Sequence, residues 1–452
     1  MFSNNTIEIE PSEPFKNDIL DRKVIADNLT KIIEKASGSI VLSIDSAWGT
    51  GKTTFVKMWK CSLDSNDNFI SLYYNAWDND DFNDPLLAIL GIFEEYFNKK
   101  ESSGFERIKT FSKPLLKKAI PTALKILTHG ILDLKDVEFG EYNESQLTEL
   151  VGSFGELEFR KLREEKKAKE EFCNALTEFQ KEQGKKIVIF IDELDRCRPS
   201  FAVETLERIK HLFNIDNYIF VLSLDKSQLS HSISTMYGNG MDSLGYLRRF
   251  IDIDYMLPLP DKKKYAEMLI QRIGLENNKK SKWFWFFLDE YVRIYDFSLR
   301  DLDKLFYYLN ILLPTTPLYD SEENYKETFL LSNGILYALL VVVKMKEQNL
   351  YQKLVSKDYS ASDILDVLRT NKVNIVDDGY YSSEWIKSIF HETLNKFLHR
   401  NTASDIQIRE GNSKIGKEDT YPDTSYDLNH LWDKQGCKLF RQLDFLDNFN
   451  LI

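Results

Sequence analysis

The sequence predicts an α/β fold: a mainly parallel β-sheet flanked by helices, followed by a mainly helical C-terminal region. Short runs rich in β-branched residues have the length and composition of buried strands, and they lie at 39–45, 69–77, 187–192 and 218–225. The first two runs are separated by a helical segment, and strand–helix–strand order is typical of parallel pairing. Strand patterns largely stop after Pro258 and Pro260, and 283–292 is typical of a helix with an aromatic core.

These patterns divide the 452 residues into successive parts. Apolar residues at helical spacing predict a helix at about 21–35, and the charged stretch 159–172 predicts a helix with a solvated face. The expected parts are a flexible N-terminus at 1–14, an α/β core at 15–257 with a helical insertion at about 98–180, a helical lid and C-terminal helical domain at 258–400, and a polar loop with a C-terminal helix at 401–452.

Composition limits the classes of function. The net charge of -12 argues against a generally basic surface that coats nucleic acid, although a local basic groove is compatible with it. The four cysteines show no metal-ligand spacing and are typical of reduced thiols in a cytosolic protein.

Membrane association is not expected. The N-terminus lacks the pattern of a signal peptide, and the most apolar run, 335–343, is too short to cross a bilayer and predicts a buried helix. The mildly amphipathic stretch 113–132 would suit a membrane surface or a partner helix, but a packed helix is the preferred interpretation. We therefore expect a cytoplasmic protein.

The turn SAWGTGKT, residues 46–53, lies between the first predicted strand and the following helix, where a phosphate-binding P-loop is found. Small residues let backbone N–H groups face phosphates, and the helix N-terminus adds positive charge. Lys52 would reach the β- and γ-phosphates, and the Thr53 hydroxyl would bind magnesium. Ser46 stands where the strict pattern has glycine. The expected nucleotide-binding residues are Trp48, Gly49, Thr50, Gly51, Lys52, Thr53 and Thr54.

A second half of the same site is predicted at the end of the run 187–192. Asp192 is placed to hold the magnesium ion, usually through its water shell, and Glu193 to orient and deprotonate an attacking water. The turn and this acidic strand end together predict binding of ATP with Mg²⁺.

The segment after Glu193 carries two arginines. Arg196 and Arg198 would suit phosphate, nucleic acid or a carboxylate, and a structural pairing of Arg196 with Asp195 is the favoured interpretation. Cys197 has no nearby histidine to activate it and is expected to be a small packed residue.

The chain resembles the KAP family of P-loop NTPases. The resemblance rests on SAWGTGKTTF, YYNAWDND, IVIFIDELDRCRP, FVLSLD, YLRRFID and FSLRDLDKLF, which span about residues 15–310. It implies an ATPase core of the additional-strand type with a helical region behind it, and it assigns Lys52, Thr53, Asp192 and Glu193 to the ATP site. Many family members carry transmembrane helices between the two motifs. Here about 140 residues separate Lys52 from Asp192 without a segment of membrane length.

The resemblance also implies roles outside the two motifs. Arg300 matches the family's arginine at the start of a helix after the core, which in related ATPases reaches the γ-phosphate from the helical lid. Ser223 and Asp225, at the end of the strand 218–225, are placed to sense that phosphate. Bacterial family members are associated with phage exclusion, so a role in defence is implied.

Arg248 and Arg249 follow the last core strand. Neighbouring residues on a helix diverge by about 100°, so only one of the two would point into a nucleotide site, and we select Arg249 as the catalytic candidate. Such an arginine would act on a neighbouring subunit. The simpler alternative is an ion pair with Asp252 or Asp254.

The most concrete functional prediction is an ATP-hydrolysing conformational switch or assembly ATPase, acting as a homo-oligomer or with an effector protein. One alternative is a motor or clamp stimulated by nucleic acid. Another is a scaffold that binds nucleotide without hydrolysing it, and the presence of Glu193 argues against that alternative.

Overall fold

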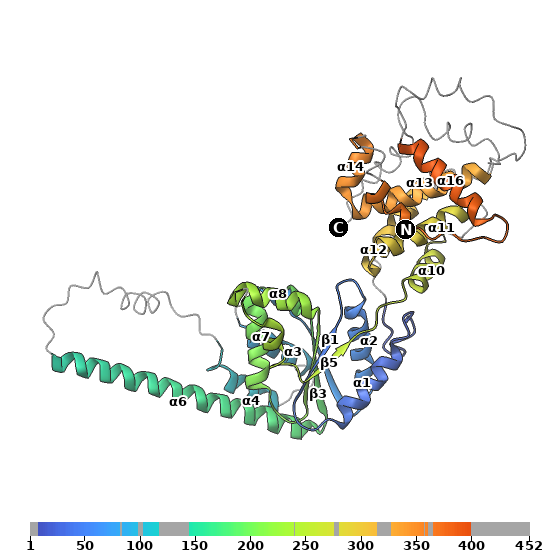
Figure 1. Ribbon diagram of the computed structural model, residues 1–452. Coiled ribbons are helices and arrows are strands. Elements are labelled where there is room, and N and C mark those ends of the chain that lie inside the picture. The colour runs from blue at the N-terminus through green and yellow to red at the C-terminus, as the bar shows by residue number, and fades with distance from the viewer. Residues whose placement is uncertain are drawn as a thin grey trace, which may run out of the picture. The chain divides into compact units, whose positions relative to one another are not determined.

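The computed structural model describes residues 8–81, 84–97, 103–116, 144–238, 240–274, 280–313, 327–356, 358–359 and 365–398, with backbone only for 97, 103, 144–162, 165 and 273. The chain forms two compact units, one spanning Thr6–Leu259 and the other including Pro260–Ile452 (Figure 1). Of the predicted segments, 1–14 lies outside the described residues up to residue 7, 113–132 from residue 117 onward, and 401–452 throughout.

The first unit contains a five-stranded sheet in the order β2-β3-β4-β1-β5, and every pair in it is parallel. The strands are β1 (Ile40–Asp45), β2 (Phe69–Asn75), β3 (Lys186–Asp192), β4 (Tyr218–Leu224) and β5 (Ile253–Met256). The predicted parallel sheet is therefore confirmed. The sequence pattern did not reveal β5, an edge strand of four residues in which half-buried and exposed side chains alternate.

Helices cover both faces of this sheet, and each face has its own apolar core. Helices α1 (Lys23–Lys35) and α2 (Lys52–Asp64) pack on one face. The other core includes residues of α3 (Pro85–Phe97), α4 (Ser103–Ser112), α6 (Glu144–Gln183), α7 (Pro199–Leu212), α8 (Lys226–Tyr237) and α9 (Ser243–Leu247). Strand β3 supplies both cores, because successive side chains of a strand point to opposite faces. Val188 and Phe190 face α1 and α2, whereas Ile187, Ile189 and Ile191 face the other layer.

The described part of the second unit is helical. Its helices are α10 (Lys262–Ile273), α11 (Lys282–Ile294), α12 (Leu299–Leu312), α13 (Glu327–Lys346), α14 (Gln348–Ser356) and α16 (Ser383–Leu398), with a single 3₁₀ turn, η5, at Thr370–Lys372. Helix α13 packs against α11, α14 and α16. The predicted mainly helical C-terminal region is confirmed in these residues.

Helix α13 is longer than the apolar run 335–343 indicated. Within the described residues it is the single helix long and apolar enough to cross a membrane, and 94% of its apolar window is buried by the rest of the unit. The run 335–343 is too short by itself to cross a bilayer, but flanking residues extend its helix to 20 residues. The prediction of a buried helix at 335–343 is confirmed.

Candidate nucleotide site

The parallel sheet brings the predicted motifs to one edge. In a parallel sheet the carboxyl ends of all strands meet at the same edge, where ligands of open α/β sheets bind. The turn 46–53 follows β1, Asp192 ends β3 and Glu193 follows it, Ser223 lies near the end of β4, and Asn75 ends β2. In the register of β3 and β4, Asp192 lies opposite Ser223.

The turn after β1 has the backbone geometry of a phosphate-binding loop. Gly49 and Gly51 adopt φ values of 75° and 85°, in the left-handed region that favours glycine. Helix α2 begins directly at Lys52. The Lys52 ammonium is buried inside the turn, where it donates hydrogen bonds to the carbonyl oxygens of Ser46 and, at 3.0 Å, Ala47. Burial lowers the pKa of Lys52, although nearby carboxylates oppose this shift. The positive charge of Lys52 is thus already positioned inside the loop that would bind a phosphate.

Arg22 supports the turn from outside, and sequence reasoning did not select it. The side chain is 4% exposed and donates hydrogen bonds to the carbonyl oxygens of Thr50 at 2.6 Å and Gly51 at 2.9 Å. Burial lowers the pKa of Arg22 to about 10. Because both carbonyl groups are held toward Arg22, these contacts restrain the turn in its bent conformation. The only sequence signal was a cationic residue at the start of the first predicted helix.

Trp48 connects the turn to the strand end beyond β3. Its indole Nε1 donates a hydrogen bond to the carboxylate of Asp195, which is 8% exposed, while its ring is 46% exposed. Burial raises the pKa of Asp195, and the hydrogen bond from Trp48 opposes the shift. The tryptophan inside the turn therefore has a contact that fixes the turn against the acidic segment.

Asp192 is buried at the end of β3. One carboxylate oxygen accepts a hydrogen bond from the Tyr73 hydroxyl at 2.9 Å, and the other accepts the backbone N–H of Glu193 at 3.0 Å. Ser223 lies opposite in the register, and its buried hydroxyl oxygen has no hydrogen-bond partner among the described residues. A buried hydroxyl without a partner is costly, so this oxygen marks a place where a water or ligand oxygen would be stabilised.

Glu193 is held by two neighbours. The residue adopts φ 62°, in the left-handed region. One carboxylate oxygen forms an ion pair with Arg196, and the other accepts a hydrogen bond from Asn75 Nδ2 at 3.4 Å. Burial raises the pKa of Glu193, and Arg196 opposes that shift. The Arg196 guanidinium also lies over the ring of Trp77, at 5.5 Å from its centroid.

The predicted pairing of Arg196 with Asp195 is therefore wrong. Asp195 bonds to Trp48 instead, and Arg196 bonds to Glu193. The 3₁₀ helix η3 (Leu194–Arg196) explains the difference, because it turns Arg196 back toward Glu193, the residue before the helix. Cys197 is buried, as predicted for a packed residue, and burial raises the pKa of its thiol.

The remaining candidate residues have the following places. Thr53 and Thr54 lie in the first turn of α2, and Asp225 caps α8 by accepting the N–H of Gln228 at 3.1 Å. Arg300 is exposed near the start of α12 in the second unit, so its role at the phosphate stays a prediction.

Arg248 and Arg249 are exposed and form no ion pair within the described residues. Asp254 pairs with Lys226, and Asp252 accepts the N–H of Val41 at 2.9 Å. The alternative of a pairing with Asp252 or Asp254 is therefore wrong. The role of Arg249 on a neighbouring subunit stays a prediction.

A glycine-bent turn with a buried lysine, at the same sheet edge as the buried Asp192 and the half-buried Glu193, defines a P-loop NTPase domain. The model of the KAP family P-loop domain matches residues 22–319, and the chain belongs to this family. The match starts at Arg22, the residue that bonds the turn.

Two relatives place the chain among known proteins. It is 22% identical over 272 residues to the phage T7 exclusion protein of Escherichia coli, a match that covers 55% of this chain and 35% of that protein. It is also 30% identical over 177 residues to the uncharacterized protein MJ0182 of Methanocaldococcus jannaschii, which covers 34% of this chain and 88% of the relative. The chain thus matches about a third of the length of the phage exclusion protein.

Among solved structures, the chain is similar to the ADP form of the ORC2 protein of Aeropyrum pernix, with 9% identity, 88% of this chain and 97% of that chain covered, and a TM-score of 0.31. It is also similar to the Drosophila ORC bound to DNA, with 13% identity, 96% and 87% coverage, and a TM-score of 0.33.

Proposed function

We propose that this protein binds ATP with magnesium and hydrolyses it, and that hydrolysis resets a conformational switch or an assembly. The observation that supports this most is the presence of Lys52 and Glu193 at one sheet edge: a buried cation for the phosphates and a carboxylate for the water. Binding alone needs only the first of these groups, whereas hydrolysis needs both.

Lys52 would exchange its hydrogen bonds to Ser46 and Ala47 for bonds to the β- and γ-phosphates. These charge-assisted bonds are stronger than bonds to carbonyl oxygens, so phosphate binding is favoured. The backbone N–H groups of 49–53 and the N-terminus of α2 would add further donors.

The Thr53 hydroxyl and the Asp192 carboxylate fit magnesium, which prefers hard oxygen ligands and keeps several waters. Among the described residues, no three His, Cys, Asp or Glu side chains come together as a metal site. Few protein ligands are expected at a magnesium site where phosphates and waters supply most of the ligands. Bound magnesium would neutralise charge on the phosphates.

Glu193 would accept a proton from the water that attacks the γ-phosphorus. Its carboxylate is engaged by Arg196 and Asn75, which occupy one lone pair on each oxygen, so the opening of either contact would make the carboxylate more available to accept the proton. We propose that this opening accompanies assembly with other copies or with an effector protein, and that it couples hydrolysis to the state of the complex.

The decisive experiment compares Glu193→Gln with the unaltered protein. Glu193→Gln should retain ATP binding in calorimetry and lower the turnover number by about 100- to 10,000-fold, the usual contribution of a positioned base. Lys52→Ala should lose both binding and turnover, and Asp27→Asn, an exposed change on α1, should alter neither. Turnover of Glu193→Gln at the normal rate would assign the base to another residue.

A role in defence against phages is the biological context that we propose, and the similarity to the phage T7 exclusion protein supports it. Plaque counts on cells that express the full chain, beside cells that express Glu193→Gln, test this context. Equal plaque counts with both chains and with an empty vector would oppose it.

A further inference from the structure

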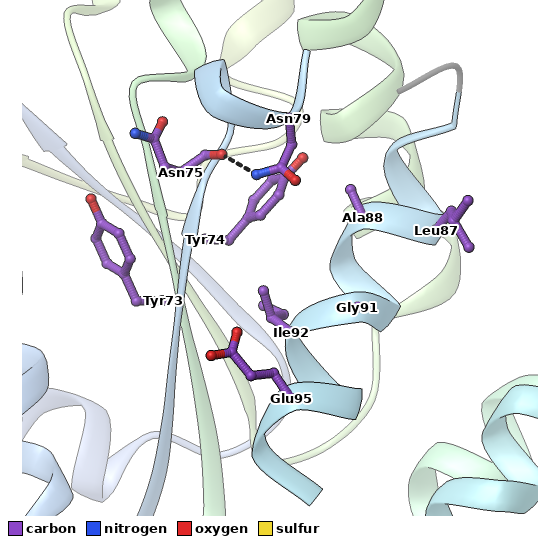
Figure 2. Close-up of a pocket in the computed structure, with 9 residues that line it drawn as sticks. All are labelled: Tyr73, Tyr74, Asn75, Asn79, Leu87, Ala88, Gly91, Ile92 and Glu95. Atoms are coloured by element: carbon purple, nitrogen blue, oxygen red, sulfur yellow. Dashed lines mark hydrogen bonds between the residues drawn. The ribbon is translucent and has the colours of Figure 1, made fainter. Parts of the chain in front are cut away.

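A cavity of about 420 Å³ opens between strand β2 and helix α3, on the side of β2 away from β3 (Figure 2). One wall is the end of β2 at Tyr73–Asn75, extended by Asn79. The opposite wall is the face of α3 that carries Leu87, Gly91 and Glu95 at intervals of four residues. We call this cavity the β2 groove.

The strand wall of the β2 groove offers unpaired backbone groups. Ala76 N–H bonds the Asp192 carbonyl at 2.9 Å, and Lys186 N–H bonds the Asn68 carbonyl at 3.0 Å, so even-numbered residues of β2 face β3. Backbone groups alternate along a strand, and the N–H and C=O of Tyr73 therefore face the groove. They have no partner among the described residues. The Tyr73 side chain packs on the α2 face, so it does not block the edge.

On the helix wall of the β2 groove, Gly91 leaves space because it has no side chain. Gly91 lies within α3, where glycine destabilises a helix relative to alanine. A Cβ built on Gly91 would meet no atom within 4 Å, so internal packing does not require glycine here. Leu87, one turn earlier, is 48% exposed and faces the same space. The groove thus has room for a chain that approaches α3 closely.

A bound ligand would stabilise two polar groups of the groove. Tyr74 is 1% exposed, and its buried hydroxyl oxygen has no hydrogen-bond partner in the part of the chain that the structure describes. Glu95 is the only charged residue in the lining, and it is exposed at the lower end of the groove in Figure 2. An occupant that carries amide groups and a positive charge would match both.

We propose that the β2 groove binds an extended peptide segment of a partner protein. The segment adds to the edge of β2 through hydrogen bonds to the Tyr73 backbone, places an apolar side chain over Gly91 beside Leu87, and directs a lysine or arginine to Glu95. Strand addition of this kind takes its affinity from main-chain bonds and its specificity from side-chain pockets.

Occupancy of the groove would reach the nucleotide site through Asn75. This residue lines the groove, and its Nδ2 bonds both Glu193, at 3.4 Å, and Asp78, at 2.7 Å. The Asn75 side chain points away from α3, whereas its carbonyl oxygen accepts a hydrogen bond from Asn79 Nδ2 at 2.8 Å beside the groove (Figure 2). A peptide that displaces Asn79 would shift Asn75 and weaken its contact with Glu193. This consequence rests on the proposed function, whereas peptide binding itself does not.

The test selects peptides from a random decapeptide library displayed on phage, with the full-length Lys52→Ala protein as bait. This bait makes binding independent of nucleotide, so failure of the groove and failure of the ATPase proposal are distinguishable. Enriched peptides are synthesised, and their affinity is measured by fluorescence anisotropy for each variant. We expect a basic residue in the consensus and a loss of at least tenfold in affinity when the central residues are N-methylated.

Matched variants localise the binding. Gly91→Phe should weaken binding by at least tenfold, and Gly91→Ala by much less, with helix content checked for both by circular dichroism. Glu95→Lys used as bait should enrich acidic peptides, while Asp27→Lys, the same charge change on α1, should enrich basic ones. The proposal is overturned if no peptide is enriched, or if Gly91→Phe folds and binds the selected peptides with unchanged affinity.

Discussion

The guanidinium of Arg196 forms an ion pair with the carboxylate of Glu193, three residues earlier in the chain. Both side chains are largely buried, and Trp77 lies against the guanidinium. The pair therefore occupies one oxygen of the proposed catalytic carboxylate. Under the proposed function, we expect slow hydrolysis in the isolated protein and faster hydrolysis wherever the pair opens.

Replacement of Arg196 should release this restraint. We expect Arg196→Ala to raise the turnover number several-fold at saturating ATP, because Glu193 then loses its strongest partner. Steady-state phosphate release measures the change, and Arg198→Ala is the control, since Arg198 pairs with Asp80 instead. A fall in turnover would show that Arg196 acts on the phosphates.

Arg22 should matter for both stability and nucleotide affinity. Arg22→Gln removes charge-assisted hydrogen bonds to two buried carbonyl groups of the turn, which should cost about 1 to 3 kcal/mol in the free energy of unfolding. It should also weaken ATP binding about tenfold, because the turn is no longer restrained. Urea denaturation and calorimetry measure the two effects. Lys23→Gln, an exposed neighbour, is the control, and equal ATP affinity in Arg22→Gln would limit Arg22 to folding.

An arginine acting on a neighbouring subunit can be detected by mixing two inactive variants. Lys52→Ala should abolish tight nucleotide binding, and Arg249→Ala should bind ATP but hydrolyse it about 1,000- to 100,000-fold more slowly if the arginine stabilises transition-state charge. A mixture should then recover ATPase activity through mixed interfaces, and Arg248→Ala is the matched test of the neighbouring residue. No recovery at any ratio, with specific activity independent of concentration, would exclude this mechanism.

Gly334 allows α11 and α13 to pack closely. A Cβ at this position would lie 2.6 Å from the backbone nitrogen of Phe284 and 2.8 Å from the carbonyl carbon of Trp283. Gly334→Ala should therefore lower the free energy of unfolding by about 1 to 3 kcal/mol through overpacking. Gly91→Ala is a matched control in a helix with open space, and it should stabilise by roughly 0.5 to 1 kcal/mol. Thermal unfolding followed by circular dichroism distinguishes the two, and equal melting temperatures would contradict the packing argument.

At low pH, the protein should lose the contribution of Asp301 to the free energy of unfolding. Its carboxylate accepts the N–H and hydroxyl of Ser298 at 2.9 and 2.8 Å and pairs with Lys346. Burial alone would raise the pKa of Asp301, but Lys346 and Ser298 outweigh it and the pKa is lowered. The stabilisation is thus present above the unfolded-state pKa of about 3.9 and is lost as pH falls through the lower folded value. Asp301→Asn should cost about 1 kcal/mol at pH 7, and urea denaturation should show this difference shrink as the pH falls below the unfolded-state pKa.

The buried strands were predictable because their signal is local. Runs such as 187–192 are apolar throughout, as expected of strands covered on both faces. Strand β5 was missed because it lies at the edge, where Asp254 and Met256 are exposed. Its assignment depends on pairing with β1, more than 200 residues earlier, which no local pattern shows.

The motifs of the candidate site were predictable from the sequence, but the ion pairs and hydrogen bonds that connect them were not. The turn and the Asp-Glu pair have fixed spacings that their chemistry requires. The partner of Arg196 and the bonds from Arg22 to the turn depend on the direction of the backbone over a few residues. For Arg196, the 3₁₀ helix after Glu193 sets this direction. Sequence adjacency favoured Asp195 and was misleading for that reason.

The position of β1 in the sheet has a consequence for synthesis of the protein. Strand β1 carries the phosphate turn, yet both of its partners, β4 and β5, lie at the far end of the same unit. The ribosome adds roughly 170 residues between the end of β1 and the start of β4, which takes about 10 to 35 s at usual elongation rates. During that interval an apolar strand has no partner and needs shielding by chaperones or by early contacts with α1 and α2. Nascent chains arrested before residue 218 should therefore fail to retain nucleotide.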